Sequence, residues 1–139
     1  MSKSDEKQAR IINTLSKCES ITDPEKHYDD LIQIKKAFLD DKEKVLIVNV
    51  VKAIGDEDRM LILDALKSKD RCVCELEAIM YKAQSSVSHH LRILEDAGLI
   101  KGWKKGKFTH YSLIRSRFVR FLDIFNRWIN STMNWFGTA

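Results

Sequence analysis

The sequence predicts a mainly helical fold with one small β-hairpin. Apolar residues recur at steps of three and four along most of the 139-residue chain, as they do on the buried faces of helices. Strand-like runs occur in a single stretch, residues 99–113. One proline and five glycines leave little room for long irregular linkers, and 44% hydrophobic residues suffice for one real core.

The N-terminal part is predicted to hold two helices. Residues 1–23 form an extension with a short amphipathic helix from about Glu6 to Lys17, and residues 24–139 form a single domain. Asp23 and Pro24 are typical of a helix start, because Asp caps the first turn and Pro fits its first position. We expect the helix that follows to carry its apolar side chains inward: Tyr28, Leu31, Ile32, Ile34, Phe38 and Leu39.

Two further helices are predicted before residue 70. Val45–Ile54 is almost entirely apolar, which indicates a helix buried on several sides. Gly55 interrupts it, and Asp56 can cap the next helix. The core candidates of that helix are Met60, Leu61, Leu63 and Leu66.

A helix-turn-helix is predicted over residues 72–97, as helices Cys72–Met80 and Gln84–Ala97 with a tight connection between them. In the second helix Val87, Leu91 and Leu94 fall at helical spacing and would seat it on a core. The rest of its surface is crowded with side chains that form hydrogen bonds: Gln84, Ser85, Ser86, Ser88, His89 and Arg92. Gly98 follows, where a left-handed residue commonly ends a helix.

A basic hairpin is predicted over residues 99–113. Its strands are Leu99–Trp103 and Phe108–Leu113, and its loop holds Lys104, Lys105 and Lys107. Residues 84–118 contain 7 basic and 2 acidic residues, a net charge of +5, whereas the whole chain has +4. Such a localised positive excess is typical of a surface that contacts nucleic-acid phosphates.

The C-terminal helix, residues 115–136, has the longest amphipathic pattern. Its apolar side chains recur at three- and four-residue steps: Phe118, Phe121, Leu122, Phe125, Trp128, Ile129, Met133 and Phe136. This is more aromatic area than one small domain covers easily, and a large exposed apolar patch usually binds a partner. We interpret it as half of a homodimer interface, shared with the helix of residues 24–39.

From residue 45 to residue 113 the chain resembles the arsenic-repressor (ArsR-type) family of winged-helix transcription factors. The segments that carry the resemblance follow one another in order: Ala53-Ile54-Gly55-Asp56 with Arg59, Cys72-Val73-Cys74-Glu75-Leu76, Gln84-Ser85, Val87-Ser88, His90-Leu91, Leu94, Ala97-Gly98-Leu99, Gly106 and Tyr111-Ser112-Leu113. The resemblance implies a winged helix-turn-helix homodimer that binds a palindromic operator in double-stranded DNA and represses transcription. Two positions depart from the family pattern, since Ala83 replaces a capping Ser and Tyr81 replaces Gly or a small polar residue.

The resemblance also implies roles for individual residues. Ser85, Ser86, Ser88, His89 and Arg92 would face the major groove, and Gln84 would hold a phosphate at the helix start. The three wing lysines, Lys104, Lys105 and Lys107, would contact phosphates with little sequence preference. For His90 we favour a structural role at the base of the helix over a DNA contact.

Cys72 and Cys74 are the candidate effector site. In many members of the family a Cys-x-Cys here binds a soft metal or metalloid. Both thiols follow Arg71 at a helix N-terminus, and both influences favour the thiolate form. Two thiolates are an incomplete site, and Cys18 could complete it, as N-terminal cysteines do in cadmium- and lead-sensing relatives. The bound species would be arsenite, cadmium, lead or zinc.

Alternatives to a metal site remain open at this stage. The two thiols could be partly buried residues without a ligand. A disulfide from Cys18 to Cys72 or Cys74 could make redox state the signal. The regulator could also respond to another ligand or to a protein partner.

Other function classes are disfavoured by what the sequence contains. No Ser/His/Asp or paired-carboxylate constellation lies outside the DNA motif, so we do not expect an enzyme. Three cysteines, an odd number, indicate a reducing compartment rather than a disulfide framework. No leader and no membrane-length apolar run are evident, so we expect a cytoplasmic protein without membrane contact.

Overall fold

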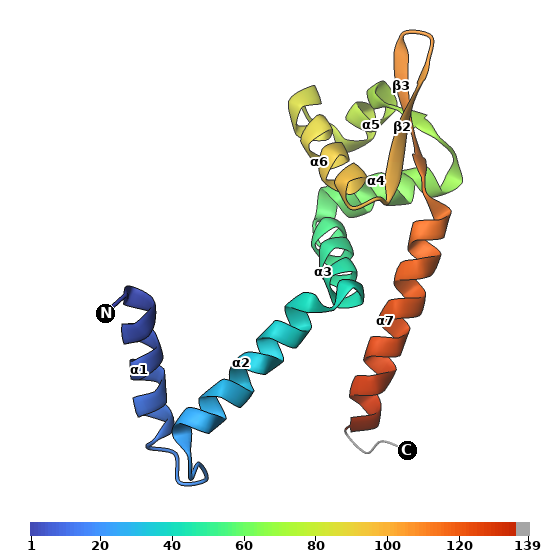
Figure 1. Ribbon diagram of the computed structural model, residues 1–139. Helices are drawn as coiled ribbons and strands as arrows, with labels where there is room; N and C mark the ends of the chain where they lie inside the picture. The colour runs from blue at the N-terminus through green and yellow to red at the C-terminus, as the bar shows by residue number, and fades with distance from the viewer. Residues whose placement is uncertain (136–139) are drawn as a thin grey trace. The chain divides into compact units, whose positions relative to one another are not determined.

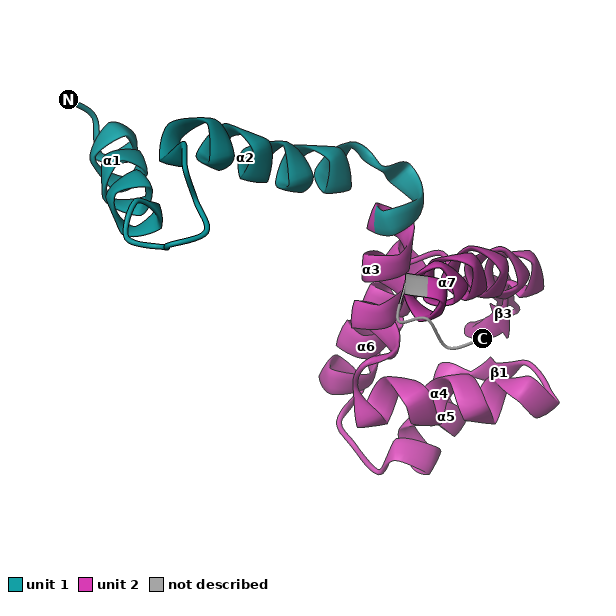
Figure 2. Cartoon of the chain, turned by 90° about the horizontal axis from the view of Figure 1, so that it is seen from below, with its two compact units in different colours: residues 1–44 teal, residues 45–139 magenta. Residues whose placement is uncertain are grey.

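The structure is a computed structural model that describes residues 1–135, with side chains up to Asn134. The chain forms two compact units, residues 1–44 and residues 45–139, which are coloured separately in Figure 2. The predicted end of the N-terminal extension, residue 23, therefore lies inside the first unit. Phe136, the last residue of the predicted C-terminal helix, lies outside the described residues.

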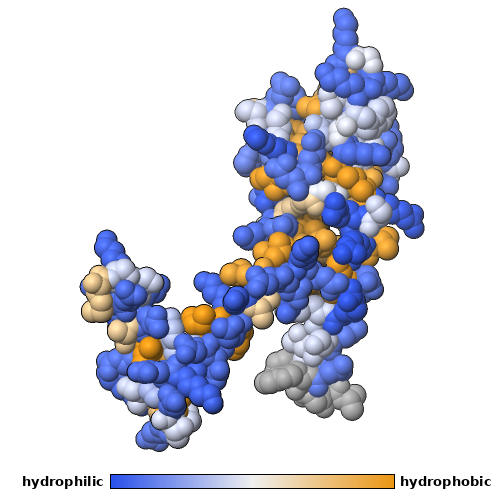
Figure 3. Space-filling view, viewed as in Figure 1, coloured by the Kyte–Doolittle hydropathy of each residue, from blue (hydrophilic) through white to orange (hydrophobic). Residues whose placement is uncertain are grey.

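The first unit consists of α1 (Lys3–Leu15) and α2 (Pro24–Asp40). The predicted start of α2 is confirmed, because Asp23 Oδ1 accepts a hydrogen bond from the Lys26 amide (3.1 Å) and Pro24 takes the first turn. Neither helix contains a buried residue. The expectation that α2 turns its apolar side chains inward is wrong within this unit, since Leu31 and Ile34 are 39% and 67% exposed. Apolar residues accordingly interrupt the polar surface along α2 in Figure 3.

The second unit is mainly helical with a small antiparallel sheet (Figure 1), so the predicted fold class is confirmed. Its elements are α3 (Lys42–Ile54, whose first turn belongs to the first unit), α4 (Glu57–Ser68), β1 (Arg71–Cys72), α5 (Val73–Met80), α6 (Gln84–Asp96), β2 (Ile100–Lys105), β3 (Phe108–Leu113) and α7 (Arg115–Trp135). The strand order is β1-β3-β2. Strand β1 was not predicted, because two residues are too few to show an alternating pattern.

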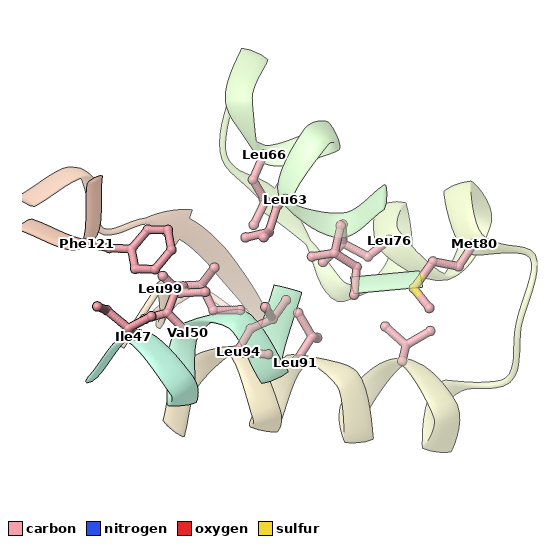
Figure 4. Packing of buried hydrophobic residues seen from close by; sticks show 14 of the residues in the cluster. Ile47, Val50, Leu63, Leu66, Leu76, Met80, Leu91, Leu94, Leu99 and Phe121 are labelled. Carbon is pink, nitrogen blue, oxygen red and sulfur yellow. The ribbon is translucent and has the colours of Figure 1, made fainter. Parts of the chain in front are cut away.

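The core of this unit lies where α4, α5 and α6 meet α3 and the start of β2 (Figure 4). The three predicted apolar residues of α6, Val87, Leu91 and Leu94, are at most 1% exposed. In α4 the prediction is confirmed for Leu63 and Leu66 but wrong for Met60 and Leu61, which are 52% and 40% exposed, and Ile62, which was not predicted, is buried instead. All of these residues are apolar, so composition alone did not show which side of α4 faces α6.

Helix α7 divides its apolar residues between two faces. Phe121 and Ile124 belong to the buried core, and Phe118 and Phe125 pack against it. On the other face Val119 and Leu122 are 57% and 54% exposed, and Trp128, two turns after Phe121 on the core-facing side, is 45% exposed. Helix α7 therefore has more apolar surface than this unit covers. None of the described helices is both long enough and apolar enough to cross a membrane.

Candidate nucleic-acid interface

Helix α6 is held against the core by one side and presents the other to solvent. Opposite the buried Val87, Leu91 and Leu94, the side chains of Ser85, Ser88, His89 and Arg92 are exposed. Their spacing of three and four residues puts these four on a single strip of the helix. Gln84 is exposed on one flank of the strip, and Ser86 is half-buried on the other. The strip combines hydroxyl, imidazole and guanidinium groups, which suit the edges of bases in a major groove.

The N-terminus of α6 has no side-chain cap. Ala83 occupies the capping position in extended conformation and offers no side-chain acceptor. The first amides to find a carbonyl are those of Ser86 and Val87, which both donate to Ala83 O at 3.0 and 3.1 Å. The preceding amides of Gln84 and Ser85 come before the first intrahelical bond, so they are suited to hold an anion such as phosphate.

Gly98 lies just after α6 and terminates the helix, as the sequence predicted. Its φ is +73°, and its amide donates to Glu95 O (2.8 Å) while the Leu99 amide donates to Leu94 O (3.0 Å). This pair of bonds is a Schellman motif, which needs a left-handed residue at this position. A side chain here would also meet the guanidinium of Arg117 at the start of α7, at 2.7 Å. The glycine thus fixes the angle at which the chain leaves α6 for the hairpin.

His90 joins α6 to α4 through Arg59. The Arg59 guanidinium is 3.2 Å from His90 Nδ1, and its Nε donates to the Ala53 carbonyl at 2.6 Å. A guanidinium can only donate, so Nδ1 must accept and the ring proton lies on Nε2, 3.4 Å from Asp58 Oδ2. The geometry gives His90 a structural place at the base of α6.

The same group of contacts joins the turn before α6 to α4. Lys82 Nζ donates to Asp58 in a short hydrogen bond, and this bond raises the pKa of Lys82. Asp56 caps α4 by accepting from the Arg59 amide (3.2 Å), a bond that lowers the pKa of Asp56. Ligand atoms of Asp56, Asp58 and His90 lie within 4.8 Å of one another, as in a cation site. Arg59 and Lys82 already supply the positive charge there, so we interpret the cluster as a structural network.

The first strand of the hairpin runs further than predicted, and the loop is shorter. Strand β2 continues to Lys105, so that Lys104 and Lys105 pair with Thr109 and Phe108 in β3. Only Gly106 (φ +63°) and Lys107 form the turn. Lys104, Lys105 and Lys107 are all exposed. The predicted basic wing is therefore a stiff two-stranded ribbon that carries its cations near the tip.

Aromatic residues of the hairpin, to which the sequence alone gave no role, make contacts within it and with α6. The Trp103 ring stacks on its cross-strand partner His110 with 4.8 Å between ring centres, and its Nε1 donates to Ser112 Oγ at 2.7 Å. Tyr111 covers Gly102 and bonds to Glu95 of α6; burial and the Glu95 carboxylate raise the pKa of Tyr111. This contact links the hairpin directly to α6.

The structure changes the chemical interpretation of Cys72 and Cys74. Cys72 is half-buried in β1 at the start of α5, and Cys74 is exposed two residues later in the first turn of α5. A hydrogen bond that the Cys74 thiol donates to the neighbouring Cys72 sulfur raises the pKa of Cys74, with burial and the Cys72 charge acting in the same direction. Arg71 binds Glu75 (3.1 Å) and the Ala65 carbonyl (2.9 Å). The prediction that both thiols are driven toward thiolate is therefore wrong for Cys74.

Cys18 is exposed in the first unit, after α1. Its part in a site shared with Cys72 and Cys74 of the second unit remains a prediction.

Comparison with known proteins places this geometry among regulators. Residues 56–101 match the family model described as bacterial regulatory protein, arsR family. The transcriptional repressor SdpR of Bacillus subtilis is 43% identical over 65 residues, 47% of this chain and 72% of that protein. A cadmium resistance transcriptional regulatory protein CadC homolog of Staphylococcus aureus is 32% identical over 87 residues, 62% of this chain and 72% of that protein.

Among solved structures, the chain is similar to a homodimeric winged helix-turn-helix DNA-binding domain from Mycobacterium bovis, a possible ArsR-family regulator. The TM-score is 0.52 at 22% identity, over 71% of this chain and 87% of that one. At this identity the similarity establishes the fold.

Proposed function

Because the chain belongs to the arsR family of bacterial regulatory proteins, we propose that it is a DNA-binding transcriptional repressor that acts as a homodimer in the cytoplasm. The family, and the similarity to a named transcriptional repressor, indicate a regulator and not an enzyme. The observation that carries the proposal is the exposed polar strip of α6, which lies in the same unit as a basic two-stranded ribbon.

In the proposed complex, α6 and the hairpin have different tasks. The α6 strip would lie in the major groove, where Arg92 can bind guanine or a phosphate and Ser88 can bind either a donor or an acceptor on a base. The hairpin lysines would neutralise phosphates, which gives affinity and salt dependence without base selection. Two copies related by two-fold symmetry would contact half-sites about one helical turn of DNA apart.

Dimerisation would use the apolar face of α7. Val119 and Leu122 are more than half exposed on the side of α7 away from the core, and apolar side chains of this size are normally buried. A second copy of the same face would cover them in a self-complementary contact. As the sequence suggested, the exposed apolar residues of α2 would add to the interface.

The first test is selection of binding sites from a random duplex DNA pool, followed by titration at several salt concentrations. Replacing Lys104, Lys105 and Lys107 with Gln should weaken binding at least about tenfold and reduce the salt slope by roughly 0.9 for each phosphate that is no longer neutralised. The matched control replaces Lys3, Lys7 and Lys17 of the first unit, which changes the net charge equally. If both triple variants bind as tightly as the wild type, the proposed DNA interface is wrong.

For the effector we propose a thiol-binding metal or metalloid at Cys72 and Cys74, with Cys18 as a further ligand. The support is the pair of hydrogen-bonded thiols at the start of α5, the first helix of the helix-turn-helix. A bound thiophilic ion would replace the thiol proton in this hydrogen bond and change the position of α5 relative to α6. A change of about 1–3 kcal/mol in operator affinity is enough for a switch.

The alternative is a regulator that uses thiol oxidation, another ligand or a protein partner. Affinity for the selected DNA, measured with arsenite, cadmium or an oxidant in wild-type, Cys18→Ser and Cys72→Ser proteins, distinguishes these cases. Release by a metal that is abolished in Cys72→Ser supports the metal site, and release by oxidant alone supports redox control. An affinity that none of the three agents alters rules out both thiol mechanisms.

A further inference from the structure

Tyr81, in the turn between α5 and α6, has a backbone that is unfavourable for its side chain. Its φ and ψ are 53° and 46°, the left-handed region, and it is the one residue other than glycine with positive φ in the described chain. For a bulky residue this conformation is disfavoured by Cβ contacts with the backbone. Glycine would avoid that cost.

The phenol of Tyr81 contributes nothing visible to the fold. The residue is 95% exposed, so its ring is almost entirely in solvent. The backbone beneath it is nonetheless fixed, since the Tyr81 amide donates to Glu77 O (2.8 Å) and the next side chain, Lys82, is bonded to Asp58 of α4. A strained residue with an exposed side chain on a rigid turn is typical of a binding position.

The position of the turn indicates what Tyr81 would bind. It stands three residues before Gln84, the first residue of α6, whose N-terminus has no side-chain cap. In helix-turn-helix complexes the N-terminal part of the second helix meets the base edges, and the first helix crosses the DNA backbone. The connection between the two helices therefore passes close to that backbone.

We propose that the Tyr81 hydroxyl donates a hydrogen bond to a phosphate oxygen of the operator backbone, at the edge of the groove that receives α6. The inference depends on the proposed DNA-binding function and adds a contact specific to this chain. Tyrosine is among the side chains that commonly bind DNA phosphates. Because the phenol is neutral, this contact would position α6 without adding to the salt dependence that the wing lysines supply.

Two substitutions test the proposal. Tyr81→Phe removes only the hydroxyl and should weaken binding to selected DNA about threefold to tenfold, with the same salt slope and the same thermal stability as the wild type. Tyr81→Gly removes the ring and relieves the left-handed strain, so it should raise the melting temperature while it weakens DNA binding at least as much. Ser4→Ala, which removes an exposed hydroxyl from α1, is the control and should leave affinity unchanged.

The outcomes separate this inference from the proposed function. Wild-type protein that selects no DNA overturns the proposed function itself. Wild-type protein that binds selected DNA, with Tyr81→Phe and Tyr81→Gly binding equally well, overturns only the Tyr81 contact. If Tyr81→Gly raises the melting temperature and weakens DNA binding, the contact is supported. If Tyr81 made no contact with DNA, its replacement by Gly would change stability alone.

Discussion

At the scale of single residues, the hydrogen bond between Cys72 and Cys74 would determine how the proposed effector reacts with them. A thiol that shares a hydrogen bond with a second thiol holds its proton more tightly, which is why the pKa of Cys74 is raised. Thiols react with metals and electrophiles as thiolates, so Cys74 should be slow to react near neutral pH. Metal binding at the pair should therefore be strongly dependent on pH, because protons compete with the metal.

Cys72→Ala should lower the pKa of Cys74 by removing its main cause. We expect the midpoint of the rate–pH profile for alkylation of Cys74 by iodoacetamide to move to lower pH. Mass spectrometry of the Cys74 peptide in a Cys18→Ser background would measure it. Cys72→Ser, which retains a hydroxyl partner, should give an intermediate profile. A midpoint that stays the same or rises in Cys72→Ala would show that the Cys72 thiol is not the cause.

At the scale of secondary-structure elements, the end of α6 depends on Gly98. Gly98→Ala must place a methyl group in the left-handed region and against Arg117, so the variant should be destabilised by about 1–2 kcal/mol of unfolding free energy, measured by urea denaturation. Gly106→Ala is the control, since its φ is also positive (+63°) but the space beside it is open. If Gly98→Ala is no less stable than Gly106→Ala, the contact with Arg117 has no energetic importance.

The sequence was most informative about elements with a clear period or a strong end signal. The buried side of α6, the start of α2 at Asp23 and the glycine after α6 were all predictable from local chemistry. Strand β1 and the extension of β2 to Lys105 were not, because pairing with β3 rather than local pattern makes them strands. The buried side of α4 was equally ambiguous, since consecutive apolar residues favour no single face.

The contacts that position the candidate site were the least predictable part. Arg59 and His90 are 31 residues apart in sequence, and Asp58 and Lys82 are 24 apart. No sequence spacing indicates that such residues meet. The Arg59 and His90 positions did appear in the family resemblance, but their shared role became visible only when α4 and α6 were packed together.

At the scale of the whole molecule, the exposed face of α7 predicts how the protein assembles. Leu122→Glu should convert a dimer to a monomer in sedimentation experiments without unfolding the chain, because Leu122 is 54% exposed in the single chain. DNA affinity should fall at least about tenfold, since two linked half-site contacts become independent. Asn134→Glu, on the polar side of α7, adds the same charge and should change neither property. A dimer that persists in Leu122→Glu would exclude this face as the interface.

Strand β1 also has a consequence for the order in which the protein folds. Pairing of Arg71 with Tyr111 closes a loop of 40 residues, and that loop contains both α5 and α6. An isolated two-stranded hairpin is marginally stable in water, whereas a third strand and a packed helix stabilise it. The third strand cannot join until the intervening helices are compact, because closing a long flexible loop costs entropy that only their packing offsets. The hairpin should therefore become fully ordered last, and amide exchange in β3 should report the completion of folding.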